Sequence, residues 1–181
     1  MEFTRTFELK DGRSCTLRHG SAGDGRQALE AFIRMHEETD YLLTYPDENT
    51  LSAEDEGEYL EKKAACGREI EILAEVDGRI AGMAGFAAVG ECSKARHRAE
   101  LGISVLRDYW RLGIGRALLE ACLECAKTAG YEQIELSVAA ENVRAVRMYE
   151  KSGFVEFGRN PRGFKSRSAG YQELIYMRKE L

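Results

Sequence analysis

The sequence predicts a domain of the α/β class, an α+β mixed sheet with helices packed on its faces. Two Asp-Gly turns, Asp11-Gly12 and Asp77-Gly78, each join two candidate strands, which predicts two hairpins. In the second half, amphipathic helical stretches alternate with short apolar runs, which predicts two strand–helix–strand crossovers inside an otherwise antiparallel sheet. The length of 181 residues suits a single domain over 1–181.

Residue periodicity places the elements of the first half. Strands are expected on either side of the two turns, at 3–9, 14–18, 69–76 and 79–89. A helix is expected at 24–39, where apolar residues recur on one side. A second helix is expected at 52–66, because Ser52 opens it with Asp55 three residues later as capping partner.

The second half is expected to alternate between strands and helices. The expected strands are 98–105, 134–138, 154–158 and 171–177. The expected helices are 111–129 and 142–152, and the basic segment 159–167 is expected to be a loop between the last two strands.

Composition excludes several classes of protein. A net charge of −5 argues against a general nucleic-acid binder. The start of the chain lacks a signal pattern, and the longest apolar stretch, 80–90, is too short to span a bilayer, so a cytoplasmic protein without a membrane partner is expected. The five cysteines are expected to be free thiols, with Cys122 and Cys125 packed in the core rather than binding a metal.

The segment from 109 to 119 predicts an anion site. It follows a strand and opens a helix, so that Gly113 and Gly115 fall in the first helical turn. The first N–H groups of a helix have no internal partner and carry partial positive charge, and glycine lets a diphosphate approach them. A Walker loop is absent, and a dinucleotide fingerprint would need a third glycine where Leu118 stands. A helix start softened by glycine is the simpler alternative.

A second motif runs from Asn142 to Phe154. Asn142 can cap a helix on which Asn142, Ala145 and Tyr149 share one face, because seven residues make two turns. Gly153 ends this helix and Phe154 begins the next strand. A capped amphipathic helix with Tyr149 in the core explains the same pattern without any ligand.

Together the two segments resemble the GNAT superfamily of acyl-CoA N-acyltransferases. The family loop Gln/Arg-x-x-Gly-x-Gly/Ala corresponds to Trp110-x-x-Gly113-x-Gly115, with Trp110 as the departure. The family helix Asn-x-x-Ala-x-x-x-Tyr-x-x-x-Gly-Phe matches here at every named position from Asn142 onward. The resemblance covers nearly the whole chain and implies a mostly antiparallel, seven-stranded sheet with flanking helices.

The resemblance also implies acetyl-CoA as co-substrate, with no metal. It implies that backbone groups near the end of one strand contact the pantetheine arm, that the following loop holds the pyrophosphate, and that the second motif contacts the CoA arm. The residues so implicated are Ile103, Ser104 and Val105, then Arg111, Gly113, Ile114, Gly115 and Arg116, then Asn142, Ala145 and Tyr149.

The mechanism implied is direct attack of a neutral amine on the thioester in a ternary complex. A backbone N–H near Val105 would polarise the carbonyl, and Tyr149 would protonate the leaving thiolate. Glu100 is the candidate base, followed by Glu135 and His97, although Glu100 also fits a surface position on a strand. A non-catalytic acyl-CoA-binding or sensing module on the same fold is the main alternative.

The sequence contains two segments that favour different amine acceptors. Segment 37–61 holds ten acidic residues without lysine or arginine, which favours a cationic small-molecule or peptide amine. The basic segment 159–167 favours an anionic group instead, and either segment also fits a solvated surface. Dimers are frequent in similar families, so a homodimer is a further expectation.

Overall fold

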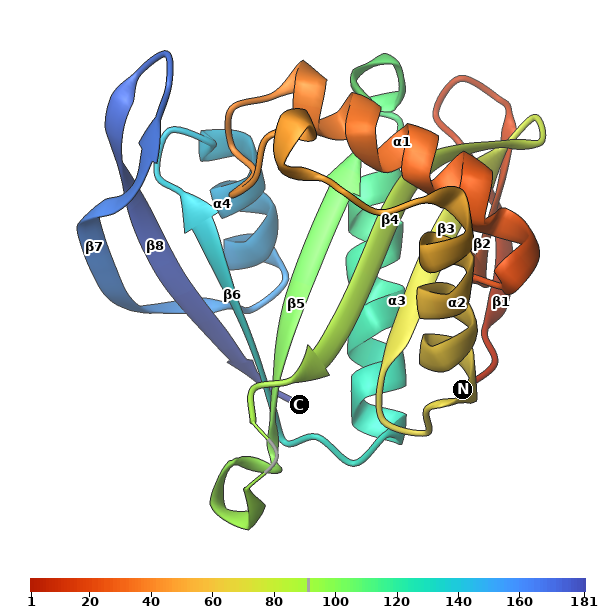
Figure 1. Ribbon diagram of the computed structural model, residues 1–181. Helices are drawn as coiled ribbons and strands as arrows, with labels where there is room; N and C mark the ends of the chain where they lie inside the picture. Colours follow the sequence, from red (N-terminus) through yellow and green to blue (C-terminus); the bar gives the residue numbers. More distant parts are fainter. Residues whose placement is uncertain (91) are drawn as a thin grey trace.

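Eight strands form one mixed sheet in residues 1–90 and 92–181, which the computed structural model describes (Figure 1). The strand order is β1-β2-β3-β4-β5-β6-β8-β7, with β5 and β6 as the parallel pair. The strands are β1 (Thr4–Glu8), β2 (Ser14–His19), β3 (Ile70–Val76), β4 (Arg79–Ala88), β5 (Arg98–Val105), β6 (Gln133–Ala139), β7 (Val155–Ser166) and β8 (Gly170–Glu180). The mixed α/β class is confirmed, and the sheet has one strand more than the resemblance implied.

Four α-helices in the same part of the chain cover the two faces of the sheet. They are α1 (Gly25–Glu38), α2 (Ala53–Ala65), α3 (Ile114–Thr128) and α4 (Val143–Lys151). Figure 1 shows α1 and α2 in front of the sheet and α3 behind it. The predicted capping box at the start of α2 is present, since Ser52 Oγ accepts from the Asp55 N–H at 3.1 Å and the Ser52 N–H donates to Asp55 at 2.8 Å.

The helix expected at 111–129 begins later than its sequence pattern indicates. Its first residue is Ile114, because Arg111 and Gly113 both adopt positive φ values, 68° and 108°, that a right-handed helix excludes. Gly113 is the N-cap, in a region that glycine adopts without steric cost.

The larger core lies between the sheet and α3. Leu118 and Cys122 are fully buried there and Cys125 is 4% exposed, so the prediction of core packing for the two cysteines is confirmed. A smaller core joins α1 and α2 to β3 and β4 through residues such as Met35, Leu60 and Leu73.

Segment 159–167, expected to be a loop, is mostly strand. It belongs to β7, which pairs with β8 in a long hairpin whose register shifts between Asn160 and Phe164. Basic residues and Pro161 are compatible with this position because β7 is an edge strand, where exposed charges and a missing N–H leave no interior ladder bond unmade.

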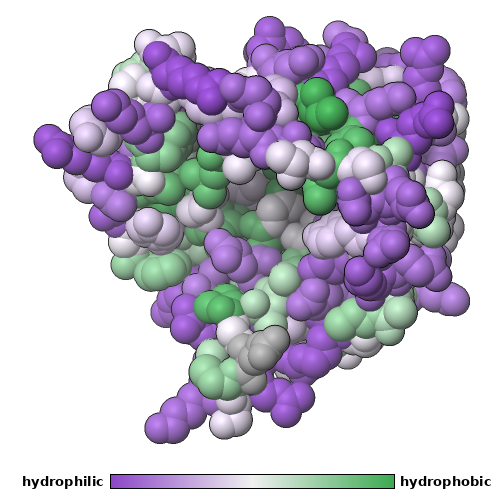
Figure 2. Space-filling model, viewed as in Figure 1, coloured by the Kyte–Doolittle hydropathy of each residue, from purple (hydrophilic) through white to green (hydrophobic). Residues whose placement is uncertain are grey.

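The sheet opens between β5 and β6. Their parallel pairing covers three positions, Arg98↔Gln133, Ala99↔Ile134 and Glu100↔Glu135. Beyond Glu100 the strands diverge toward the top of Figure 1, and Figure 2 shows a hollow on this side of the molecule between the β7–β8 hairpin and α1. Among the described helices none is both long and apolar enough to cross a membrane.

The packing of Leu118 yields a prediction about stability. Leu118→Ala should lower the free energy of unfolding by about 2–5 kcal/mol, because the side chain is fully buried and its removal leaves a cavity. Chemical denaturation measures this change. Leu51→Ala, at a position 51% exposed, is the control and should change it by less than about 0.5 kcal/mol. Equal effects of the two substitutions would contradict the assignment of Leu118 to the core.

Candidate active site

The end of β5 directs backbone groups into the gap beside it. The Leu106 N–H donates to the Ala81 carbonyl on the β4 side at 2.9 Å. Backbone groups of successive strand residues point to opposite sides, so Val105 faces the gap. There the Val105 carbonyl accepts a hydrogen bond from Trp110 Nε1 at 2.6 Å.

The same alternation separates the three residues expected to contact a pantetheine arm. Ile103 and Val105 direct their backbone groups into the gap, where β6 has already diverged. Ser104 directs its backbone groups to β4, and a Cβ placed on Gly82 would lie 3.2 Å from the Ser104 carbonyl oxygen. Ser104 therefore lies at the site without a free backbone edge, a distinction that sequence alone does not make.

The amino end of α3 offers several unpaired donors. The Ala117 N–H makes an intrahelical bond to the Gly113 carbonyl at 3.1 Å, so the N–H groups of Ile114, Gly115 and Arg116 precede the helical ladder. The first turn contains no acidic residue. Positive partial charge from the helix is therefore available to an anion at this position.

Packing does not require the glycine at 115. A Cβ placed there would lie 3.7 Å from Met148 Sδ and 3.8 Å from Val105 Cγ2, which are ordinary contact distances. The missing side chain therefore matters outside the fold, where it leaves the first N–H groups open to a ligand.

Trp110 ties the loop to the strand. In addition to its hydrogen bond to Val105, its ring lies 4.1 Å from the Arg144 guanidinium and 5.6 Å from that of Arg107. Burial and the nearby Arg111 lower the pKa of Arg144. The residue that departs from the family pattern thus orders two cations beside the helix start, a role that its position in the motif did not reveal.

The motif helix α4 is capped as predicted. Asn142 Oδ1 accepts from the Ala145 N–H at 3.3 Å. Tyr149 is 7% exposed, and its ring packs 5.6 Å from that of Phe154. Burial raises the pKa of Tyr149, so its phenol stays protonated at neutral pH. Tyr149 is therefore a core residue and a candidate acid at the same time.

The three candidate bases occupy different surroundings. Glu100 is exposed at the last paired position of β5 and β6. Glu135 lies opposite Glu100, but Arg98 Nε and Nη2 donate to its two carboxylate oxygens, and these hydrogen bonds lower the pKa of Glu135. His97 precedes β5 at the end remote from Val105 and lines a separate cavity with Arg68 and Arg96. Glu100 alone among the three candidates meets two conditions. It lies where β5 and β6 separate, and its carboxylate belongs to no ion pair of the described residues.

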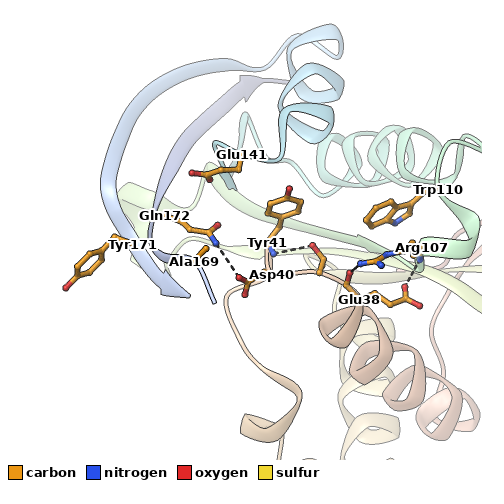
Figure 3. Close-up of a pocket in the computed structure, with 10 residues that line it drawn as sticks. Glu38, Asp40, Tyr41, Arg107, Trp110, Glu141, Ala169, Tyr171 and Gln172 are labelled. Atoms are coloured by element: carbon orange, nitrogen blue, oxygen red, sulfur yellow. Dashed lines mark hydrogen bonds between the residues drawn. The ribbon is translucent and has the colours of Figure 1, made fainter. Parts of the chain in front are cut away.

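A cavity of about 520 Å³ opens on the α1 side of the gap (Figure 3). It is bounded by the end of α1, the segment after it, the loop before α3, the turn before α4 and the tip of the β7–β8 hairpin. Its lining residues are Glu38, Thr39, Asp40, Tyr41, Arg107, Trp110, Glu141, Ala169, Tyr171 and Gln172. In Figure 3 the Tyr171 side chain points away from the other labelled residues.

Asp40 connects two distant parts of the chain at this cavity. Its carboxylate accepts hydrogen bonds from the hydroxyls of Ser166 and Ser168, the latter at 2.7 Å, and from Tyr45 at 3.3 Å. These hydrogen bonds lower the pKa of Asp40, and the one from Ser166 has the largest effect. Asp40 therefore stays ionised and holds the hairpin tip against the segment after α1.

The acidic and basic segments meet here. Arg167 pairs with Asp47 at 2.9 Å and stacks 4.0 Å from the Tyr45 ring. Arg159 is bound within its own hairpin by Glu156 and Glu173. The two segments, which from sequence alone favoured opposite acceptors, thus partly neutralise each other.

The remaining polarity of the cavity favours a hydrogen-bond donor or a cation. The Glu38 carboxylate accepts a hydrogen bond from the Arg107 backbone N–H at 2.6 Å, and the Arg107 guanidinium donates to the Glu38 backbone carbonyl. Asp40 and Glu141 add negative charge to the lining. Gln172 is 5% exposed, and its Oε1 is buried without a hydrogen-bond partner among the described residues. An unsatisfied buried acceptor is costly, so a donor entering here would be stabilised.

Comparison with known proteins now identifies the family. The model of the Acetyltransferase (GNAT) family matches residues 29–154, a range that includes α3, α4 and the gap between β5 and β6. This chain therefore belongs to the GNAT acetyltransferase family.

Individual relatives agree with this assignment. An N-alpha-acetyltransferase from Sulfurisphaera tokodaii is 35% identical over 92 residues, which cover 46% of this chain and 55% of that protein. A GNAT-family acetyltransferase from Streptococcus pneumoniae superposes with a TM-score of 0.88 at 29% identity, covering 92% of this chain and 99% of the other. A phosphinothricin acetyltransferase from Sinorhizobium meliloti, solved in complex with acetyl-CoA, shares the fold with a TM-score of 0.80 at 18% identity, covering 92% and 88%.

The bonds around Asp40 predict how the cavity wall is held. The amides of Ser168 and Ala169 both donate to Ser166 Oγ at 3.0 Å, and that hydroxyl donates to Asp40. Asp40→Asn weakens this charged acceptor, so hydrogen exchange of the two amides should accelerate about ten-fold, equivalent to about 1.4 kcal/mol. Exchange measured by NMR tests this, and Asp77→Asn at an exposed turn is the control. Unchanged exchange in Asp40→Asn would show that the tip is held by other contacts.

Proposed function

We propose that this protein transfers the acetyl group of acetyl-CoA to the amino group of a cationic acceptor. The observation that carries the proposal is the gap between β5 and β6, which leads directly to the glycine-capped start of α3. An extended arm can pair with the free edge of β5 while the diphosphate at its end meets the N–H groups of the helix.

The residues of the site fit acetyl-CoA in three respects. Backbone groups of Ile103 and Val105 face the gap that the pantetheine arm would occupy. The N–H groups of Ile114, Gly115 and Arg116 would hold the pyrophosphate. The solved relative in complex with acetyl-CoA supports the same co-substrate by likeness of fold.

The chemistry follows from these positions. A neutral amine entering from the cavity attacks the thioester carbonyl carbon, and a C–N bond forms as the C–S bond breaks. A backbone N–H at the β5 edge stabilises the negative charge that develops on the carbonyl oxygen. Tyr149, which stays protonated in its buried position, gives its proton to the departing thiolate.

The acceptor is proposed to be a cation because of the cavity lining. The lining holds three acidic residues, Glu38, Asp40 and Glu141, against the one guanidinium of Arg107. The Gln172 Oε1 has no hydrogen-bond partner among the described residues. An ammonium group supplies both the charge and the donors that this lining lacks. The relative named N-alpha-acetyltransferase adds a peptide α-amine to the acceptors to be tested.

Two measurements test the proposal. Calorimetry should show that acetyl-CoA binds and that ATP and NAD do not. Thiol release should then be followed across 1,4-diaminobutane, a peptide with a free α-amine, an aminoglycoside and glutamate, with the cationic amines expected to react fastest. Binding of acetyl-CoA without thiol release from any amine would favour a non-catalytic acyl-CoA-binding module instead.

The open helix start predicts the effect of a side chain at position 115. Gly115→Val should weaken acetyl-CoA binding at least about ten-fold, because its methyl groups cover the N–H donors, a loss of about 1.4 kcal/mol. Calorimetry gives the dissociation constant. Gly67→Val is the control, since a Cβ there meets no atom within 4 Å. An unaltered dissociation constant in Gly115→Val would place the phosphates elsewhere.

The role of the phenol yields a second prediction. Tyr149→Phe should keep acetyl-CoA affinity, because the buried ring remains, and should lower turnover about ten-fold or more, because the proton donor is lost. Steady-state thiol release measures both. Tyr131→Phe is a matched control, since Tyr131 is also a buried tyrosine and its hydroxyl lacks a partner among the described residues. Wild-type turnover in Tyr149→Phe would exclude the acid role.

A further inference from the structure

A row of three residues crosses the sheet from β3 to the gap. Glu71 on β3 pairs with Gly85 on β4, and Gly85 pairs with Gly102 on β5. All three belong to the face that carries α1 and α2, because their chain neighbours Ile72, Phe86 and Leu101 are buried in the core on the α3 side. The row therefore ends beside the open edge of β5.

The two glycines leave a slot along this row. A Cβ on Gly85 would collide with the Glu71 side chain, with the carboxyl carbon at 2.8 Å. A Cβ on Gly102 would meet no atom within 4 Å. The Glu71 carboxylate thus lies over Gly85 and faces free space above Gly102, next to Ile103, whose backbone faces the gap.

Charged groups from α2 and β3 surround this carboxylate. Burial raises the pKa of Glu71 to about 7, Lys63 opposes the shift, Glu56 adds to it, and the Tyr59 hydroxyl lowers it. Lys63 is itself bound to Glu69 at 2.5 Å, so it is shared between two acids.

The other strands bring few charges to the row. β4 contributes none, since its facing residue is Gly85. Glu100 on β5 stands two residues before Gly102 and is exposed. Glu71 takes part in no ion pair of the described residues, and a carboxylate that accepts from the Tyr59 hydroxyl still has acceptor sites for a ligand.

We propose that Glu71, rather than a residue of β5 or β6, takes the proton from the ammonium form of the acceptor. The proposal rests on the acetyl transfer proposed above. The Glu71 carboxylate extends over β4. Adjacent strands lie roughly 5 Å apart, so the carboxylate is one strand spacing away from β5. One water molecule above Gly102 would span such a distance between the carboxylate and an amine held over β5 beside the gap.

The ammonium loses two protons in this reaction, and Tyr149 gives one proton and regains one. The ammonium gives one proton through the water to Glu71, and the nitrogen lone pair forms the bond to the thioester carbon. The C–S bond breaks and the thiolate takes the proton of Tyr149. The second proton leaves the nitrogen for solvent, from which Tyr149 is reprotonated, and Glu71 releases its proton after the amide departs. The net products are the amide, free CoA and one proton.

The test is the pH dependence of kcat/KM with 1,4-diaminobutane, whose amines ionise far above neutral pH. If Glu71 accepts the proton, wild-type kcat/KM should rise through about pH 7 and reach a plateau above pH 8. In Glu71→Gln it should fall about 100-fold near pH 7 and rise about ten-fold per pH unit up to pH 9, because the neutral amine must then come from solution. Glu58→Gln, at an exposed position on α2, should match the wild type.

Thermal melting checks that Glu71→Gln is folded. Glu71→Gln should melt at pH 8 at a temperature no lower than the wild type, since it removes a carboxylate whose ionisation burial disfavours. A wild-type pH profile in Glu71→Gln, or the loss of the plateau in Glu100→Gln instead, would overturn the assignment of Glu71 while leaving acetyl transfer intact.

A second readout does not depend on turnover. The carboxyl resonance of Glu71 in ¹³C-glutamate-labelled protein is identified by its absence from Glu71→Gln and titrated with CoA, with and without 1,4-diaminobutane. A bound ammonium favours the carboxylate, so the midpoint should move to lower pH when the amine is present. An unmoved midpoint overturns the proposal, whether or not the wild type acetylates any amine. Thiol release from the wild type separately decides the proposed function.

Discussion

The separation of β5 from β6 after three paired residues is the constraint on which the rest of the site depends. Strand edges inside a sheet normally satisfy each other, so an interior gap leaves backbone groups that need other partners. Trp110 supplies one of them at the Val105 carbonyl, and the N-terminus of α3 stands at the mouth of the same gap. A ligand that pairs with a strand and ends in phosphates would complete the hydrogen bonds that the fold leaves unmade.

The charges of this protein are organised around that gap. Cationic side chains and helix N–H groups gather at the start of α3, where Arg107 and Arg144 flank the Trp110 ring. Carboxylates lie on the α1 side, in the lining of the cavity and at Glu71 on the same face of the sheet. An anionic carrier and a cationic acceptor would therefore enter from opposite sides, and their reacting atoms would meet at the gap.

The cavity beside the gap is built from parts far apart in the chain. Asp40 after α1 binds hydroxyls at the tip of the β7–β8 hairpin, and Arg167 on that hairpin pairs with Asp47. From composition alone, the acidic segment favours a cationic acceptor and the basic segment favours an anionic group. Their contact removes the conflict, because charges bound to each other contribute little to the field that a ligand meets.

Local sequence determined most elements and the motifs at their ends. The Asp-Gly hairpins, the Ser52 capping box, the Asn142 cap and the glycines before α3 all depend on neighbours within a few residues. It misplaced segment 159–167, whose strand exists through pairing with β8, and the start of α3, which positive φ values delay. Tertiary structure alone decided that Ser104 faces β4, that Glu135 is held by Arg98 and that Glu71 lies over Gly85. The reason is physical: hydrogen-bond direction, ion pairing and burial depend on strands brought together across the sheet, and their register cannot be computed from any one of them.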